Sequence, residues 1–154
     1  MNQNKNINSD ASRREDQKKV MAKIEGVGHC PFCQENLFKY HKKPILKEGQ
    51  YWILTDNQWP YDNIKHQLLA IYKKHIDHFK DIDPEAGAEL FSLFQEEIKK
   101  RNIPGGGIAM RFGSNLPIGD YGTSVYHLHV HLVEPDLESL SSKENWKFKF
   151  GQRF

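Results

Sequence analysis

The sequence lacks a long hydrophobic run, since no apolar stretch approaches the ~18 residues that a membrane-spanning helix requires. Its polar start, MNQNKNINSDASRRED, also lacks the apolar core of a signal peptide. Cysteine is scarce, with two residues in the chain. We therefore expect a cytoplasmic protein without a membrane partner, whose two thiols stay reduced and do not form a structural disulfide.

A charge excess of one sign is also missing. Lys and Arg total 22 against 20 Asp and Glu, so the formal net charge is +2. This balance gives no reason to expect a nucleic-acid partner. At 154 residues and 38% hydrophobic composition, the chain is long enough for one domain with a core and too short for two.

The first part of the chain differs in composition from the rest. Residues 1 to about 16 are rich in Asn, Ser and charge, which is typical of a disordered tail, although a helix is expected from near Asp10 through ASRREDQKKVMAKI. We assign residues 1–23 to an N-terminal tail, disordered or helical, and residues 24–154 to the folded domain. No internal repeat interrupts this domain.

The remaining pattern predicts an α+β domain with one sheet and one long helix laid across it. Asp83 can cap this helix, Pro84 occupies its first position, and apolar residues recur at helical spacing to about Arg101. Strands are expected at residues 49–55, 66–72, 108–112 and 123–134. The segment ENWKFKF, 144–150, alternates charged and aromatic residues, which favours a half-buried edge strand over a nucleic-acid contact.

Three histidines occupy every second position of YHLHVHLVEP, namely His127, His129 and His131. In a β-strand, side chains two residues apart share a face, so the aliphatic residues between them enter the core and the imidazoles form the other face. Imidazole can attack phosphorus, transfer protons or bind a transition metal. A strand with merely polar surface histidines is the less favoured interpretation.

The two cysteines, Cys30 and Cys33, lie in HCPFC, a spacing that lets both thiolates reach one tetrahedral ion. This spacing supplies half of a metal site, and His75 with one of the three histidines can supply the rest. Two free thiols in a turn are the alternative. A thioredoxin-like redox pair is disfavoured because no βαβ pattern follows the cysteines.

Two motifs, HLHVHLV after GTSVY and the upstream segment WPYDNIKHQLLAIYKKHI, carry a family resemblance. Together they resemble the signature and the preceding segment of the histidine triad family of nucleotide hydrolases and transferases. The resemblance spans roughly Cys30 to Pro135. It implies a histidine-triad-like α+β fold with an antiparallel sheet, a nucleotide substrate and pairing of two chains as a homodimer.

The resemblance also implies roles for individual residues. His129, the middle histidine, would attack the α-phosphorus and form a nucleotidyl-histidine intermediate, while His131 and His66 would contact the phosphate. Ser124 resembles the serine that assists the leaving group. Asn115 matches an asparagine near the phosphate.

Two further sites follow by position. Asn57 is the candidate for the ribose hydroxyls, with Asp56 as the neighbouring option. Family members with a similar cysteine pair hold a structural zinc, which implies the ligands Cys30, Cys33, His75 and His127 here. The remaining histidines are expected at the surface: His29, His41 and His78.

The sequence departs from the family pattern at Lys65, which replaces a glycine, at Tyr72, which replaces a proline, and in the loop 114–123, which carries an extra residue. A lysine beside the phosphate site would favour longer, more acidic polyphosphates. The loop length leaves the role of Asn115 open, and an ordinary turn residue is the alternative for both Asn115 and Asn57.

Several functions remain open at this point. A hydrolase, a phosphorylase and a transferase differ only in the acceptor: water, inorganic phosphate or a sugar phosphate. A metal-dependent hydrolase with His127, His129 and His131 around a catalytic ion is one alternative, and a nucleotide-binding module without turnover is another.

Overall fold

The computed structural model describes residues 6–8, 11–12 and 14–154. Its centre is an antiparallel five-stranded sheet in the order β1-β2-β3-β6-β4. The strands are β1 (Ile45–Glu48), β2 (Trp52–Asp56), β3 (Ile64–Tyr72), β6 (His129–Pro135) and β4 (Gly107–Met110). This confirms the predicted α+β class and antiparallel sheet. Within the described residues, no helix is both long and apolar enough to cross a membrane.

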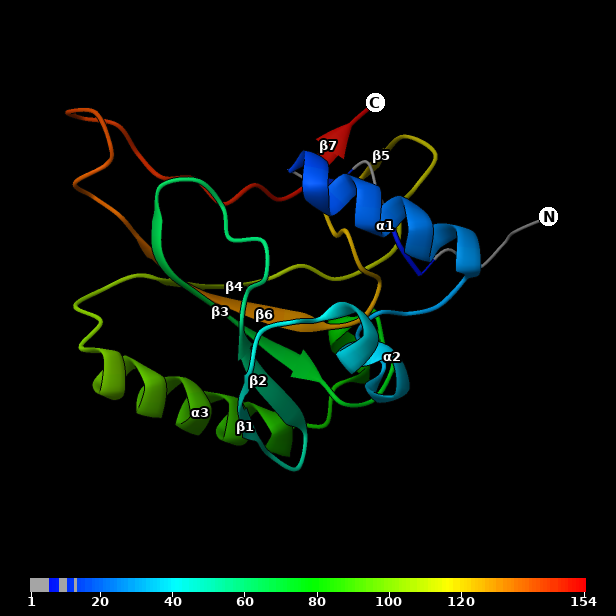
Figure 1. The fold of residues 1–154 in the computed structure, drawn as a ribbon, viewed down its shortest axis with the longest axis horizontal. Coiled ribbons are helices and arrows are strands. Elements are labelled where there is room, and N and C mark those ends of the chain that lie inside the picture. The colour runs from blue at the N-terminus through cyan, green and yellow to red at the C-terminus, as the bar shows by residue number, and fades with distance from the viewer. Residues whose placement is uncertain (1–5, 9–10, 13) are drawn as a thin grey trace.

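The predicted long helix is α3 (Glu85–Arg101), which covers one face of the sheet (Figure 1). Its buried Leu90 and Phe94 pack against the even-numbered residues of the central strands, among them Leu68, Ala70 and Val130. Side chains alternate along a strand, so the odd-numbered residues must face the other way. The main core therefore lies under α3, and the opposite face is left for the site.

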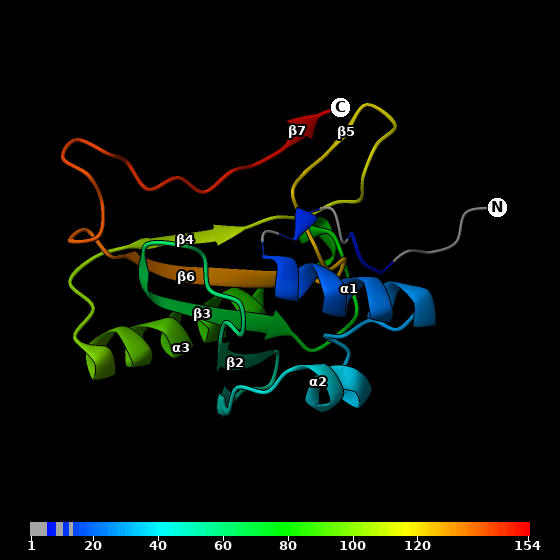
Figure 2. The same ribbon diagram turned by 45° about the horizontal axis from the view of Figure 1, so that its top comes forward.

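Two shorter helices lie toward that opposite face: α1 (Glu15–Val27) and α2 (Gln34–Tyr40). Leu37 of α2 packs against the odd-numbered Leu69 and Ile71 of β3. Met21 of α1 is buried in a small cluster with Val125, the residue that bridges Ile7. Figure 2 shows α1 alongside the ends of β3 and β6. The expected helix start, Asp10, lies outside the described residues, and the domain boundary at residue 24 stays a prediction.

The C-terminal segment differs from the expected strand. Residues 144–150 are irregular, and only β7 (Gln152–Arg153) pairs, with β5 (Gly119–Asp120). The aromatic side chains form a cluster of rings instead: Trp146 stacks on Tyr61 at 6.0 Å between ring centroids, and Phe148 contacts Phe150 at 5.1 Å with the rings tilted. The segment runs back across the molecule toward β5 (Figures 1 and 2).

All three histidines expected at the surface have side-chain contacts, and His29 Nδ1 lies 3.2 Å from the Tyr40 hydroxyl. His41 is buried, and its ring Nε2 lies 2.7 Å from the Thr55 hydroxyl oxygen. Because that hydroxyl donates its proton to the Pro44 carbonyl, the hydroxyl oxygen accepts from Nε2–H of His41. His78 accepts from the Lys80 amide at the start of a short 3-10 helix. The His41 contact depends on Thr55, a residue 14 positions away that folding brings close, whereas the His78 contact is local, to the amide two residues later.

Candidate functional site

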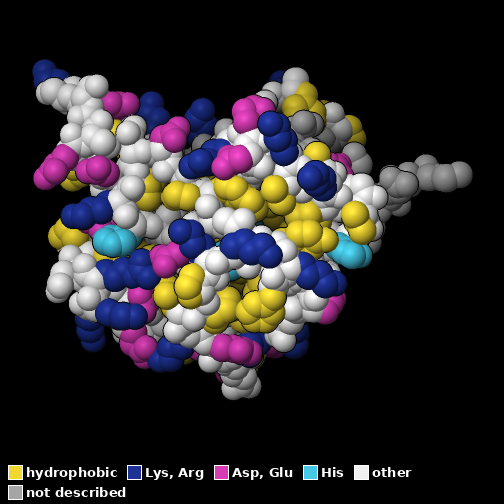
Figure 3. Space-filling model, viewed as in Figure 1, with side chains coloured by type: hydrophobic (Ala, Val, Ile, Leu, Met, Phe, Trp, Pro, Cys, Tyr) yellow, Lys and Arg dark blue, Asp and Glu magenta, His cyan; other side chains and the backbone are white. Residues whose placement is uncertain are grey.

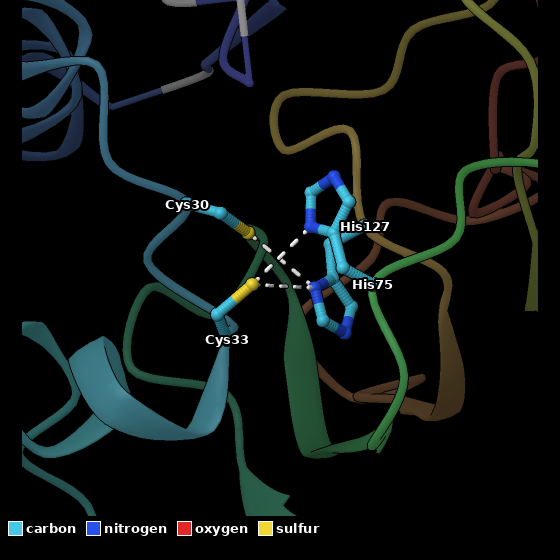
Figure 4. Close-up of side chains that lie close together, drawn as sticks. All are labelled: Cys30, Cys33, His75 and His127. Carbon is cyan, nitrogen blue, oxygen red and sulfur yellow. Dashed lines mark hydrogen bonds between the residues drawn. The ribbon is translucent and has the colours of Figure 1, made fainter.

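The structure brings together four potential metal ligands: Cys30, Cys33, His75 and His127. Their ligand atoms all lie within 4.8 Å of one another (Figure 4). Cys33 Sγ is 3.2 Å from His75 Nδ1, and Cys30 Sγ is 3.3 Å from His127 Nδ1. The cysteines precede α2, His75 follows β3, and His127 precedes β6. Segments far apart in sequence thus meet at one point.

The protonation states of the histidine and cysteine side chains in this cluster fit a bound metal cation. His127 Nε2–H donates to the Tyr72 carbonyl, so Nδ1 keeps its lone pair toward the sulfurs. Burial lowers the pKa of His127 to about 4, which keeps the ring neutral. Burial and the neighbouring Cys30 thiol raise the pKa of Cys33 to about 12. Two thiols that resist ionisation side by side, next to a neutral imidazole with a fixed tautomer, fit a divalent ion that would displace their protons.

His129 lies at the start of β6, and a backbone carbonyl two residues earlier orients its ring. Its Nδ1–H donates to the His127 carbonyl at 2.7 Å, so Nε2 carries no proton. Burial, with a smaller effect of the Arg111 charge, lowers the pKa of His129 to about 4. Phe32 packs edge-on against the ring at 5.1 Å between centroids. The ring is therefore neutral, and Nε2 is the nitrogen that keeps its lone pair.

His131 has the complementary tautomer. The Gln67 side-chain oxygen accepts from the Tyr61 amide at 2.8 Å, which turns the Gln67 nitrogen toward His131 Nδ1 at 3.1 Å. Because an amide nitrogen donates, Nδ1 of His131 must accept, and the ring proton resides on Nε2. The two rings are in contact at 5.1 Å between centroids, one with a bare nitrogen and one with a donor.

The structure does not bring His66 together with His129 and His131. His66 pairs in register with Glu134, and its Nδ1 is 2.7 Å from a Glu134 carboxylate oxygen. Both residues have even numbers, so they lie on the face that α3 covers, whereas Gln67 occupies the place beside His131. Lys65, expected beside the phosphate, is largely exposed and lies 3.9 Å from the same carboxylate. His66 and Gln67 are neighbours on β3, so their side chains lie on opposite faces of the sheet, and Gln67 is the one beside His131.

A pocket opens at His129 and His131, and Ser124 and Asn57 also line it. The Asn57 side-chain oxygen accepts from the Trp59 amide at 3.1 Å, so its nitrogen is the group left for a ligand. Asp56 points elsewhere, to Arg101 at 2.7 Å. Asn115 is exposed on its loop and does not line this pocket, unlike the other nucleotide-binding candidate.

Sequence reasoning missed three residues of the site. Gln67 was missed because the adjacent His66 matched the family pattern and received the role instead. Phe32 lies between the two cysteines, and its position in HCPFC was the available signal. Arg111 follows β4 and lines the pocket with both histidines, although nothing in IAMRF marked it.

The first triad position, His127, also differs from expectation. The strand was expected over 123–134, with three histidines on one face, but β6 begins at His129. The His127 amide donates to the Val125 carbonyl in a tight turn just before the strand. This turn aims His127 at the cysteines and leaves only His129 and His131 for the pocket.

Comparison with known proteins agrees with this geometry. A family model described as "Scavenger mRNA decapping enzyme C-term binding" matches residues 29–147. No curated protein sequence matches the chain significantly.

Solved structures supply the fold comparison. A histidine triad protein from Clostridium difficile is 18% identical with a TM-score of 0.55, and the match covers 88% of this chain and 100% of that one. A zinc-bound histidine triad family protein from Mycobacterium smegmatis is 20% identical with a TM-score of 0.54, over 75% of this chain and 82% of that one. A protein described as "Hit Like Protein" is 26% identical with a TM-score of 0.50, over 62% and 88%.

The matched residues 29–147 contain the cysteine pair and the pocket histidines His129 and His131, and they make up most of the chain. The sheet with one long helix across it agrees with the histidine triad structures. The chain therefore belongs to the histidine triad family, in the group that this family model describes.

Proposed function

We propose that this protein cleaves nucleotides at the α-phosphate through a covalent nucleotidyl intermediate on His129. One observation carries the proposal: adjacent rings in one pocket have opposite tautomers, with a bare Nε2 on His129 and an Nε2–H on His131. A nucleophile beside a hydrogen-bond donor is the arrangement that attack on a phosphoryl group requires.

In the first step, His129 Nε2 forms a bond to the α-phosphorus while the bond to the leaving group breaks, and the leaving group takes the electron pair. The His127 carbonyl holds the Nδ1 proton and stabilises the positive charge that develops on the ring. His131 Nε2–H donates to a phosphoryl oxygen, where charge accumulates. In the second step an acceptor such as water attacks phosphorus, and the P–N bond breaks to free His129.

The walls of the pocket supply the remaining roles. Ser124 lines the pocket, and in this proposal its hydroxyl donates to the leaving group as a general acid, which is worth roughly 10²–10⁴-fold in rate. Asn57 presents its side-chain nitrogen for a ribose hydroxyl. Both roles are supported by position on the pocket wall and by the family resemblance.

A structural zinc would be held by Cys30, Cys33, His75 and His127. When bound, it would supply a charge that neutralises the two thiolates and fixes the turn before β6. It would leave His129 and His131 out of its ligand set, which separates this proposal from a metal-dependent hydrolase. The zinc-bound relative from Mycobacterium smegmatis supports the idea.

The test is AMP release from adenosine 5′-phosphoramidate and diadenosine polyphosphates by wild type and His129→Ala, with and without inorganic phosphate. Wild-type turnover, loss of it in the variant, and a nucleotidylated His129 trapped by acid quenching and identified by mass spectrometry are the expected results. Phosphate dependence identifies the acceptor. Nucleotide binding without turnover by either protein would instead support a binding module.

A homodimer stays a prediction from the family. The family resemblance implies pairing through the long helix and a strand. The edge strand β4 carries the half-exposed Ile108, and α3 carries the exposed Phe91, so both elements have apolar side chains at the surface. Apolar side chains are also exposed on the face that carries α1 and α2 (Figure 3). Sedimentation equilibrium of wild type and of Ile108→Lys would test the pairing.

A further inference from the structure

Arg111 lies beside His129 because of the register of two strands. Ala109 pairs with His131 and Met110 with Val130, so the next residue, Arg111, reaches the level of His129 on the same face. Both side chains line one pocket. A guanidinium therefore enters the site from the edge strand, although the sequence gave it no role.

The guanidinium is fixed in place rather than extended into water. Arg111 is 7% exposed, its Cζ lies 3.9 Å from the centroid of the Phe148 ring, and Nε donates to the Lys149 carbonyl at 2.9 Å. One terminal nitrogen donates to the Tyr61 hydroxyl at 3.2 Å. These three contacts are with neutral groups, and together they fix the orientation of the guanidinium. The C-terminal segment thus acts as the support of Arg111.

The part of the pocket wall next to Arg111 is formed by Gly122 and Ser124, and Ser124 is the residue proposed to donate to the leaving group. Gly122 lines the pocket two residues before Ser124, and a Cβ on Gly122 would lie 3.1 Å from Arg111 Nε. Gly122 also has a φ of +81°, which other residues rarely adopt. A glycine is needed for the loop to approach the guanidinium this closely. Arg111 and Ser124 are therefore on the same side of the pocket.

Two buried hydroxyls adjoin this wall. Ser12 is 3% exposed and Thr123 is 6% exposed, and neither hydroxyl has a hydrogen-bond partner within the described part of the chain. Their immediate neighbours Ala11 and Ser124 line the pocket. Ser12 and Thr123 are not among the residues that line the pocket, so their hydroxyls only add polarity behind this wall.

We propose that Arg111 and this wall form a subsite for an anionic polyphosphate leaving group, which makes nucleoside polyphosphates preferred over phosphoramidates. The inference rests on the proposed function for placing the α-phosphorus at His129. When His129 Nε2 bonds to the α-phosphorus, the bond to the bridging oxygen breaks and its electron pair becomes negative charge on the leaving phosphate. A planar guanidinium can bind two oxygens of that phosphate. The amine of a phosphoramidate offers no such oxygens.

Binding and turnover test the subsite separately. Calorimetric Kd values for AMP, ADP and ATP are measured on wild type, Arg111→Gln and Arg111→Lys. Wild type should bind ATP at least about tenfold more tightly than AMP, Arg111→Gln should lose that ratio, and Arg111→Lys should recover part of it. This comparison needs no turnover, so it remains decisive even if the enzyme proposal fails.

In the kinetic comparison, Arg111→Gln should lower kcat/KM for diadenosine triphosphate about tenfold more than for adenosine 5′-phosphoramidate. The control is Arg153→Gln, which removes an exposed arginine on β7. Circular dichroism and thermal unfolding check the fold of each variant. Phe148→Leu, which removes the ring under Arg111 but no charge, should raise the Kd for ATP and leave that for AMP unchanged.

Any of three results would overturn the subsite. One is an equal Kd change for AMP and ATP in Arg111→Gln, which would indicate a structural role or an α-phosphate contact. Another is an equal loss of kcat/KM on both substrates. A wild type that binds ATP and AMP equally would overturn it as well.

Discussion

Gln67 donates its side-chain amide to Nδ1 of His131 at 3.1 Å, and the Tyr61 amide prevents the reverse orientation by donating to the other end of Gln67. The proton of His131 is thereby placed on Nε2, the nitrogen proposed to contact the phosphoryl oxygen. A residue on the neighbouring strand β3 thus sets the chemical role of a ring on β6.

Changing Gln67 should change activity through the tautomer of His131. A carboxylate only accepts, so Gln67→Glu should draw the ring proton to Nδ1 and lower kcat/KM about 10²-fold, the typical cost of one lost donor to the transition state. Gln67→Met forces no tautomer and should cost less. Two-bond ¹H–¹⁵N spectra of His131 would show which nitrogen is protonated in each protein.

His66→Gln is the control for Gln67, because His66 lies on the other face with Glu134. It should leave the His131 spectrum unchanged. The idea fails if Gln67→Glu keeps the Nε2–H tautomer, or if Gln67→Met and Gln67→Glu lose activity equally.

Zinc content should separate the metal cluster from the nucleophile. We expect about one zinc per chain in wild type and in His129→Ala, and loss of the metal in Cys30→Ser, because a serine hydroxyl does not replace a thiolate. With free zinc at a thousand times its Kd, binding adds about 4 kcal/mol to the free energy of unfolding. Elemental analysis and denaturant unfolding with and without a chelator would measure both effects.

Two outcomes would contradict the structural-zinc proposal. The first is loss of zinc in His129→Ala, which would instead favour an ion at the reacting histidines. The second is a wild type whose unfolding is unaffected by chelation and by added zinc.

Glu89 of α3 should stabilise the turn between β1 and β2. Its carboxylate accepts from the backbone amides of Gln50, Tyr51 and Trp52 at 2.9 to 3.0 Å. Glu89→Ala would leave these amides without their charged acceptor, at a cost of about 3 kcal/mol in the free energy of unfolding. Urea unfolding would measure the loss.

Glu96→Ala is the matched control for Glu89, since Glu96 is on the same helix and contacts only the exposed Lys47 among the interactions described. An exposed ion pair of this kind contributes about 0–1 kcal/mol. Similar losses in the two variants would show that the carboxylate does not organise the turn.

Acid should destabilise the protein partly through His41. Burial lowers the pKa of His41, with Lys43 acting in the same direction and Asp56 opposing it. The unfolded state, with an ordinary pKa near ~6.5, therefore takes up a proton before the folded state does. The stability from His41 is complete above that pH and is lost as the pH falls toward the lower, folded value.

The pH slope of stability checks this. In His41→Gln, which keeps a donor for Thr55, the loss of unfolding free energy between pH 7 and pH 5 should be smaller than in wild type, by at most about 1.4 kcal/mol per pH unit. The other buried histidines are common to both proteins, so they cancel in the difference. His78→Gln, altered outside the core, should keep the wild-type slope, and an unchanged slope in His41→Gln would contradict the account.

The sequence predicted the histidine triad family, the α+β class, the long helix α3 and the cysteine–histidine cluster. The class and the helix rest on local patterns, whereas the family and the full set of metal ligands came from the family resemblance. Alternation marks a strand, helical spacing from Pro84 marks α3, and the two-residue spacing of Cys30 and Cys33 marks half of a tetrahedral site.

The occupants of the pocket depended on the tertiary structure. His66 and Gln67 are adjacent in sequence, and only strand register decides which of them faces His131. Arg111 enters the site because β4 pairs with β6, and the aromatic C-terminal segment supports it instead of forming a strand.

The sequence by itself determined which chemistry is available, because the kinds of reactive groups and their local spacing are written in the chain. Only the tertiary structure decided which groups meet, which face each occupies and which ring nitrogen holds a proton. These properties depend on contacts between residues such as Gln67 and His131, 64 positions apart, and such contacts exist only after folding.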